Sequence, residues 1–256
     1  METFLREAAR QGRPALGLWS SLGDCLALEA MAASGPDYVC IDLQHGAATD
    51  ANLVPMLQAV AAGGSAPIVR VPAESPAAIM RALDAGARGV IVPLVESGAQ
   101  AARVVAACRY PPRGSRSFGP FRASIHAGTS RPDDLEQVAS IVMVETKAGI
   151  DHLEEIVTTE GLTGVYIGPS DLSLALGLPP ASIDAPEFVS LVERIRNLCR
   201  AHGVVPGMHC HNGATAQRAI AQGFGMVTVA ADLGTLRLAL LSELERARQA
   251  LPADGG

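Results

Sequence analysis

The chain has 256 residues, of which 48% are hydrophobic and 18% are charged. That balance predicts a folded protein with a large buried core and excludes a disordered or fibrous chain. The net charge is −6 and the basic residues are dispersed, so nucleic acid is not expected as a partner. Charges near the N-terminus, and the lack of an apolar run long enough for a bilayer, predict a cytoplasmic protein with no membrane contact.

Eight short β-rich segments alternate with eight Ala- and Leu-rich helical segments. The expected strands are residues 15–20, 37–42, 67–71, 89–93, 141–145, 164–168, 204–208 and 226–229. The expected helices are residues 24–33, 50–61, 76–85, 100–108, 148–158, 186–202, 214–222 and 233–251. This repeat predicts a closed (β/α)8 TIM barrel, α/β in class, as a single domain over residues 1–256. An open doubly wound sheet is the alternative, but no Gly-x-Gly-x-x-Gly follows the first strand.

Residues 110–132 form the longest connection, between the fourth helix and the fifth strand. The segment is rich in Arg, Gly, Ser and Pro. Connections of this length in a compact domain usually carry a function of their own. We therefore expect a functional loop or a contact between subunits.

Reacting groups in TIM barrels come from the C-terminal ends of the strands. Here those ends carry Asp42 with His45, Arg70, Glu145, the stretch Gly168-Pro169-Ser170-Asp171, and His209 with His211. Five of the eight strand ends therefore present groups that could do chemistry.

Glu145 and Asp171 each follow an apolar strand, at the expected mouth of the barrel. Two carboxylates that leave positions for water and substrate suit Mg²⁺ or Mn²⁺. Each acid could instead simply begin a loop, and Asp171 could cap a helix. His209 and His211 could ligate zinc with a third ligand, line a pocket, or lie on the surface.

His45 and Arg70 complete the expected site. His45 could act as a base that Asp42 orients, or it could be an ordinary loop residue. Arg70 interrupts an apolar strand, where its guanidinium could bind a carboxylate or an enolate oxygen, or form an ion pair with Glu145 or Asp171. Gly168–Asp171 opens a helix, whose N–H groups could hold a substrate carboxylate.

Five stretches of this sequence resemble one family. They are Ile41-Asp-Leu-Gln-His-Gly46, Ile68-Val-Arg-Val71, Arg109-Tyr-Pro-Pro-Arg-Gly114, Val144-Glu-Thr146 and Ile167-Gly-Pro-Ser-Asp-Leu-Ser173. On these residues the chain resembles the metal-dependent (class II) HpcH/HpaI 2-oxo acid aldolases, which are aldehyde-lyases similar to 4-hydroxy-2-oxo-heptanedioate aldolase. The likeness runs from the first strand to the eighth.

The resemblance implies a function and a set of roles. A 4-hydroxy-2-oxo acid would be cleaved reversibly to pyruvate, or a related 2-oxo acid such as hydroxypyruvate, and an aldehyde, through an enolate on a divalent ion (Mg²⁺ or Mn²⁺, with Co²⁺ possible). It implies Glu145 and Asp171 as metal ligands, His45 as catalytic histidine, Arg70 as enolate-stabilising arginine and Asp42 as the acid beside His45. It also implies Asp84 as an acid lent by a neighbouring subunit in a homohexamer, a trimer of dimers.

Two departures leave the aldehyde open. Gln44 stands where some aldolases of the family carry Glu. His209 and His211 stand where relatives are more apolar, so His209 is expected to contribute to a more polar substrate pocket.

Two rival activities stay open at this stage. A Schiff-base aldolase needs a lysine, and Lys147 is the only lysine in the chain. An acyl-CoA lyase similar to the citrate lyase beta subunit would need a basic surface for the nucleotide, for which Arg109, Arg113, Arg116 and Arg122 are candidates. Contact between subunits is the other expectation for those arginines.

Overall fold

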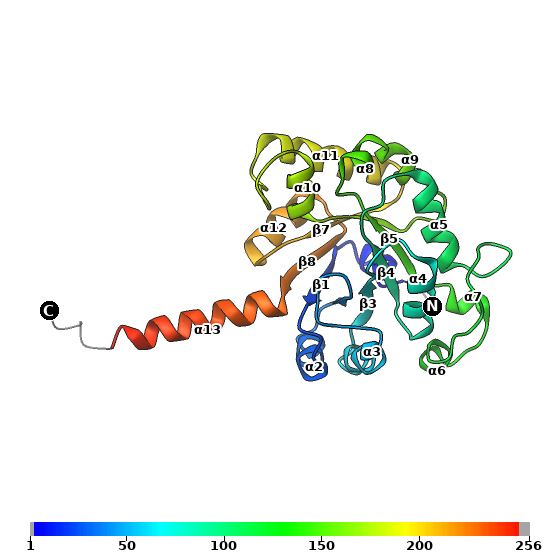
Figure 1. Cartoon of the computed structure of the whole chain (residues 1–256), viewed down its shortest axis with the longest axis horizontal. Helices are drawn as coiled ribbons and strands as arrows, with labels where there is room; N and C mark the ends of the chain where they lie inside the picture. The colour runs from blue at the N-terminus through cyan, green and yellow to red at the C-terminus, as the bar shows by residue number, and fades with distance from the viewer. Residues whose placement is uncertain (1–2, 251–256) are drawn as a thin grey trace.

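Eight parallel strands close into one barrel in chain order (Figure 1). The computed structural model describes residues 3–250. The strands are β1 (Ala15–Ser20), β2 (Tyr38–Asp42), β3 (Ala66–Arg70), β4 (Gly89–Val92), β5 (Ala139–Met143), β6 (Gly164–Ile167), β7 (Val205–His209) and β8 (Met226–Ala231). The predicted (β/α)8 barrel is confirmed, and the open sheet is excluded because β1 pairs with β8.

Helices follow the strands and cover most of the barrel. They are α2 (Cys25–Ala33), α3 (Leu53–Ala62), α4 (Pro76–Asp84), α5 (Gly98–Cys108), α8 (Lys147–Asp151), α9 (Leu153–Val157), α10 (Pro169–Ala175), α11 (Pro186–Ala201), α12 (Gly213–Gln222) and α13 (Asp232–Arg248). α1 (Phe4–Arg10) precedes the barrel, and α6 (Ala123–Ala127) and α7 (Pro132–Leu135) interrupt the long connection. Several helices begin at a side-chain cap, as where Asp24, Ser75 and Asn212 accept an N–H of the first turn.

The barrel interior is filled by side chains, so the barrel is not a channel. Tyr38 and Tyr166 are fully buried inside it, and both hydroxyls meet Thr228 Oγ1, at 2.9 and 2.5 Å. Glycines make room for these rings, because a methyl group on Gly17 or Gly207 would lie 2.1 or 2.5 Å from a ring atom. The packed interior leaves the C-terminal strand ends as the place for a site.

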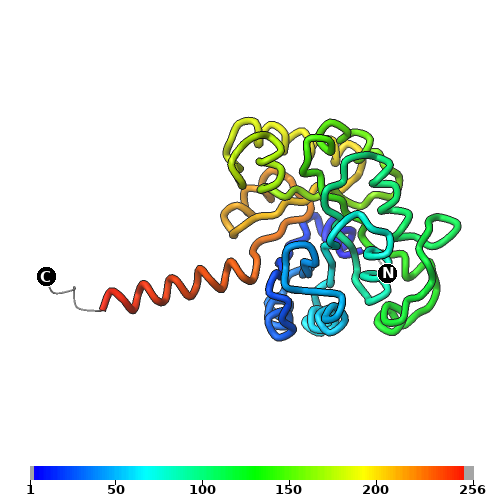
Figure 2. Tube along the Cα trace, in the orientation of Figure 1, coloured from blue at the N-terminus to red at the C-terminus, as the bar shows by residue number. Residues whose placement is uncertain are grey.

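The last helix, α13, leaves the barrel and projects away from it (Figures 1 and 2). It has no buried residue, and its exposed leucines are Leu233, Leu236, Leu238, Leu240, Leu241 and Leu244. Its first residue is nevertheless fixed, because Asp232 accepts hydrogen bonds from Ser20 Oγ (2.8 Å) and from the backbone N–H groups of Ser21 (2.8 Å) and Leu22 (3.2 Å). The direction of α13 is therefore set by the rim of the barrel.

Within residues 3–250, no helix combines the length and the apolar character needed to cross a membrane.

Candidate active site

A buried ion pair joins the ends of β2 and β3. Arg70 Nε and Nη2 donate to the two carboxylate oxygens of Asp42 at 2.8 and 2.5 Å. Asp42 is 1% exposed and Arg70 is 8% exposed. Burial alone would raise the pKa of Asp42, but the Arg70 guanidinium lowers it below the usual value overall. The partner of Arg70 is thus Asp42, and not the ion pair with Glu145 or Asp171 that the sequence also allowed.

Asp42 also organises the loop that carries His45. Its Oδ1 accepts the backbone N–H groups of Gln44 (3.0 Å) and His45 (3.2 Å), and its Oδ2 accepts the indole N–H of Trp19 (3.2 Å). The His45 side chain is exposed. Asp42 therefore orients His45 through the backbone, whereas the sequence suggested a contact with the base itself.

Glu145 lies two residues beyond the end of β5 and is 3% exposed. Its Oε1 accepts the N–H of Leu94 at 3.0 Å, and its buried Oε2 has no hydrogen-bond partner. Burial, with a smaller contribution from the nearby charge of Asp171, raises the pKa of Glu145 to about 7. A buried carboxylate oxygen without a partner is costly, so this residue is built to receive a proton or a cation.

Asp171 approaches the same place from the first turn of α10 and is exposed. Gly168 immediately precedes the helix, and its backbone passes close to Glu145: a methyl group on Gly168 would lie 2.8 Å from Oε2. The unpartnered oxygen of Glu145 and the nearby anionic Asp171 fit a divalent cation, which prefers such ligands. Among residues 3–250 no group of three His, Cys, Asp or Glu side chains is assembled as a metal site, so other ligands would have to be water or substrate.

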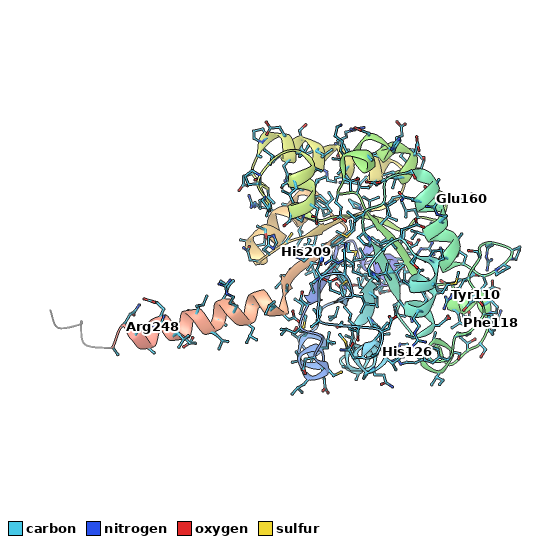
Figure 3. All side chains as sticks on the ribbon, viewed as in Figure 1. Tyr110, Phe118, His126, Glu160, His209 and Arg248 are labelled. Atoms are coloured by element: carbon cyan, nitrogen blue, oxygen red, sulfur yellow. The ribbon has the colours of Figure 1, made fainter. Side chains whose placement is uncertain are left out.

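His209 ends β7 and therefore lies at the C-terminal end of the barrel (labelled in Figure 3). Its ring stands edge-on to Trp19 with centroids 5.0 Å apart, and the His211 ring lies 5.5 Å from it. Burial, with the nearby charges of His211 and Arg70, lowers the pKa of His209 to about 4, so the imidazole is neutral. The geometry matches the pocket-lining prediction, and no zinc site of the kind considered from the sequence is assembled in the described residues.

Asp84 lies away from these groups. It ends α4, and because the helices run antiparallel to the strands, that position is at the opposite end of the barrel from Glu145. Arg116 Nη2 donates to it at 2.8 Å, and burial raises the pKa of its carboxyl group. The structure does not bring Asp84 to the mouth of its own barrel.

Lys147 does not enter the mouth. It is the first residue of α8, its side chain is 78% exposed, and its ammonium group pairs with Asp151 at 3.2 Å. Alternation along the strand does not apply, because β5 has ended four residues earlier. A Schiff base at Lys147 is therefore disfavoured by position.

The arginines considered for a nucleotide are occupied within the chain. Arg109 and Arg122 donate to the carbonyl oxygens of Glu136 and Ala85, at 2.5 and 2.8 Å. Arg113 pairs with Asp133 and Glu136, and Arg116 pairs with Asp84. These contacts leave little basis for a coenzyme A surface.

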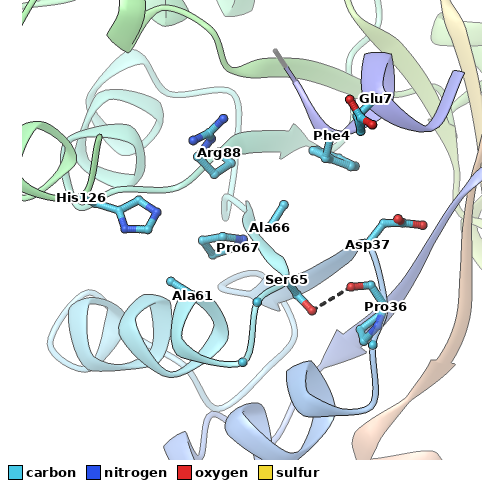
Figure 4. Close-up of a pocket in the computed structure, with 13 residues that line it drawn as sticks. Phe4, Glu7, Pro36, Asp37, Ala61, Ser65, Ala66, Pro67, Arg88 and His126 are labelled. Atoms are coloured by element: carbon cyan, nitrogen blue, oxygen red, sulfur yellow. Dashed lines mark hydrogen bonds between the residues drawn. The ribbon is translucent and has the colours of Figure 1, made fainter. Parts of the chain in front are cut away.

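Cavities elsewhere in the molecule are poorly placed for the reaction. One of about 670 Å3 is lined by Pro36, Asp37, Ser65, Arg88 and His126 (Figure 4). Pro36 and Asp37, Ser65, and Arg88 directly precede β2, β3 and β4. The cavity therefore lies at the N-terminal end of the barrel, where catalysis is not found in this fold.

Two site residues were not predicted from the sequence. Trp19 is the only tryptophan of the chain and lies in β1, which was a usable signal. Leu94 has φ of 55°, an uncommon value for leucine, and no sequence pattern marks it. That conformation turns its N–H toward Glu145.

Known proteins resemble this chain over most of its length. The sequence pattern of the HpcH/HpaI aldolase/citrate lyase family matches residues 15–239. The chain is 39% identical over 246 residues to a hydroxypyruvate/pyruvate aldolase of Rhizorhabdus wittichii, and the aligned region covers 95% of this chain and 98% of that protein. It is 36% identical over 227 residues to a 5-keto-4-deoxy-D-glucarate aldolase of Salmonella paratyphi A, covering 87% and 88%.

Solved structures give the same relationship. An HpcH/HpaI aldolase/citrate lyase family protein from Burkholderia cenocepacia superposes with a TM-score of 0.83 at 34% identity, over 92% of this chain and 95% of that one. The citrate synthase SbnG superposes with a TM-score of 0.83 at 30% identity, over 96% and 97%. The resemblance seen in the sequence is confirmed, and the chain belongs to the HpcH/HpaI aldolase/citrate lyase family.

Proposed function

We propose that the chain is a metal-dependent aldolase that reversibly cleaves a 4-hydroxy-2-oxo acid to pyruvate, or a related 2-oxo acid such as hydroxypyruvate, and an aldehyde. Two relatives that cover most of the chain are named as aldolases of 2-oxo acids. The observation that carries the proposal is the buried, unpartnered Oε2 of Glu145 beside Asp171 and Arg70.

A divalent ion, Mg²⁺ or Mn²⁺ with Co²⁺ as a further candidate, would be held by Glu145 and Asp171. Enzymes of this family generally depend on a divalent metal ion. When bound, the ion would draw electron density from the keto oxygen of the substrate. Leu94 keeps the Glu145 carboxylate in place through its N–H, and Gly168 leaves the room that carboxylate needs.

Arg70 stabilises the charge that develops on the keto oxygen as carbon–carbon bond cleavage leaves an enolate. Two of its donors already hold Asp42, so the guanidinium is fixed before substrate binds and pays little ordering entropy. The backbone N–H groups at Ser170 and Asp171, in the first turn of α10, hold the substrate carboxylate; Pro169 has no N–H to contribute.

His45 takes the proton from the 4-hydroxyl group in cleavage, as a general base. Asp42 fixes the backbone of this base, because its Oδ1 accepts the N–H groups of Gln44 and His45. In the direction of synthesis the same imidazole takes a proton from C3 of the 2-oxo acid.

Exchange of the pyruvate methyl protons for deuterium tests the proposal without knowledge of the aldehyde. We expect NMR to show exchange with Mn²⁺ or Mg²⁺, none after exhaustive EDTA treatment, and little in Glu145→Gln with metal present. Exchange that persists in metal-free protein would exclude the metal-dependent enolisation.

We further propose that the chain works as a homo-oligomer, a hexamer built as a trimer of dimers, in which α13 packs on a second copy. Six exposed leucines on one helix cost too much in water to remain uncovered. The place that an eighth helix would cover on its own barrel is open: the last three residues of β8 are partly exposed, and Leu26 on neighbouring α2 is 74% exposed.

The α13 helix of a second copy could cover this open part of the barrel, because it carries the same exposed leucines. Assembly also provides the way for Asp84 to reach a catalytic mouth, since the end of α4 lies away from the mouth of its own barrel. The exposed Phe118, Phe121 and Ile125 near Asp84 extend the surface that assembly would bury.

A further inference from the structure

Gln44 carries a buried hydrogen-bond acceptor that has no partner. Its side-chain oxygen, Oε1, is buried and accepts no hydrogen bond within residues 3–250. In the same part of the chain, the other buried amide or carboxylate oxygen without a partner is Oε2 of Glu145, the proposed metal ligand. An amide oxygen only accepts hydrogen bonds, and leaving it buried without a donor is costly. A donor that arrives with a bound ligand would remove this cost.

The backbone of Gln44 lies at the barrel mouth, because one carboxylate oxygen links it to Arg70. Asp42 Oδ1 accepts the N–H of Gln44 at 3.0 Å and the Nε–H of Arg70 at 2.8 Å. The same oxygen accepts the N–H of His45, the proposed base, at 3.2 Å. Leu43, which precedes Gln44, packs on the opposite side, against the apolar cluster between the strands and the helices. Gln44 is therefore a neighbour of both groups that act on the substrate.

The loop that carries Gln44 is tightly folded. A methyl group on Gly46 would lie 2.4 Å from the carbonyl oxygen of Asp42, and the N–H of Ala47 donates to the carbonyl oxygen of Ser21 at 2.8 Å. These backbone contacts fix the loop before substrate binds, so the cost of ordering it is already met.

The hydrogen-bonding groups of the substrate decide which donor fits. In pyruvate the carboxylate and the keto oxygen only accept hydrogen bonds, and the methyl group donates none, so pyruvate offers Gln44 no partner. In hydroxypyruvate the same carbon, C3, carries a hydroxyl group, which can donate. C3 is the atom from which His45 takes a proton in synthesis, so a substituent on C3 lies close to His45 and to the adjacent Gln44.

We propose that Gln44 is a specificity-determining residue, whose Oε1 accepts the C3 hydroxyl of the 2-oxo acid and thereby selects hydroxypyruvate over pyruvate. The inference rests on the proposed aldolase function, which leaves the choice between these two acids open. A site with a buried polar group discriminates against a substrate that lacks the matching hydroxyl, because the group then stays unpaired.

The test follows the exchange of the C3 protons for deuterium by NMR, with Mg²⁺, for hydroxypyruvate and for pyruvate. The rate without protein is subtracted for each acid. Because the two acids differ in their intrinsic rates of enolisation, the decisive quantity is how a substitution changes the ratio of the two kcat/KM values.

Gln44→Met keeps the length of the side chain but removes its oxygen. It should lower the ratio of hydroxypyruvate to pyruvate kcat/KM by about tenfold, the order expected for one hydrogen bond to a buried acceptor. Gln44→Leu should do the same, and serves if the methionine variant does not fold. Gln44→Glu returns an oxygen to the same place and should keep the wild-type ratio. Gln222→Met makes the first change at an exposed position at the end of α12, and should leave the ratio unchanged.

An equal loss of exchange with both acids in Gln44→Met would assign the missing donor to water, and an unchanged ratio would separate Gln44 from the C3 hydroxyl. Either result overturns the proposed selection. Metal-dependent exchange with an unchanged ratio defeats the role of Gln44 alone, whereas no exchange with either acid in the wild-type protein defeats the aldolase together with it.

Discussion

Gly168 and Glu145 lie so close that a methyl group on Gly168 would come within 2.8 Å of Glu145 Oε2 and 2.9 Å of the Met143 side chain. The φ of Gly168 is −93°, which any residue can adopt. A glycine is therefore required here because a side chain would collide with Glu145, the proposed metal ligand, and not because of the backbone conformation.

Gly168→Ala should lower the rate of pyruvate proton exchange by roughly a hundredfold, because displacing a catalytic group by about 1 Å has an effect of that order. Gly213→Ala is the matched control, since nothing lies within 4 Å of the added methyl group. Circular dichroism should show both variants folded. Full exchange in Gly168→Ala would mean that Oε2 has no part in the reaction.

Arg70→Lys should remove most of the activity although it keeps the positive charge. Lysine cannot reproduce the two-pronged contact with Asp42, so neither group stays in place. We expect kcat to fall by at least about a hundredfold, the order of an oxyanion donor. Steady-state kinetics decide this, and a change confined to KM would assign Arg70 to substrate binding alone.

Lys147→Ala should keep the wild-type kcat, because the ammonium group is exposed and pairs with Asp151. Borohydride added with pyruvate should leave the mass of the wild-type protein unchanged. A covalent adduct at Lys147 would restore the Schiff-base mechanism.

His209 should make the protein less stable as the pH falls below about 6.5. Its folded pKa of about 4 is lower than that of a free imidazole. Between these two values the unfolded chain binds the extra proton, so stability is complete above 6.5 and decreases as the pH falls toward 4. Thermal unfolding of wild-type protein and His209→Asn at pH 5 and 7.5 measures this, and an equal pH dependence in both would contradict it.

Substituting Leu236 and Leu240 on α13 by Asp should yield smaller assemblies, because both leucines are about half exposed and lie four residues apart on one helix face. Ser242→Asp is the control for added charge on α13. Light scattering after size exclusion gives the mass. An unchanged mass in the double variant would remove α13 from the interface.

The sequence was sufficient for much of this arrangement. The alternation of strands and helices predicted the barrel, and reading the strand ends located Asp42 and Arg70 at the ends of β2 and β3. It placed Glu145 at the end of a strand, whereas β5 ends at Met143 and Glu145 lies in the irregular segment that follows, where its carboxylate is buried.

Other features depend on three-dimensional packing and could not be predicted. The left-handed backbone of Leu94 and the unpartnered Oε2 of Glu145 depend on how the segments after β4 and β5 meet. The helix expected at residues 233–251 is observed as α13, which begins at Asp232 and ends at Arg248; residue 251 lies outside the described part. No sequence pattern indicated that this helix would leave its barrel.

Asp232 joins the base of α13 to the backbone of Ser21 and Leu22 and to the Ser20 hydroxyl, directly after Trp19. If α13 packs on a second copy, that contact also fixes the position of Asp232 and, through its hydrogen bonds, the residues that follow Trp19. Turnover per subunit should then fall when the enzyme is diluted below the dissociation constant of the assembly, and recover on reconcentration. Catalytic rate would thereby report how many copies are assembled.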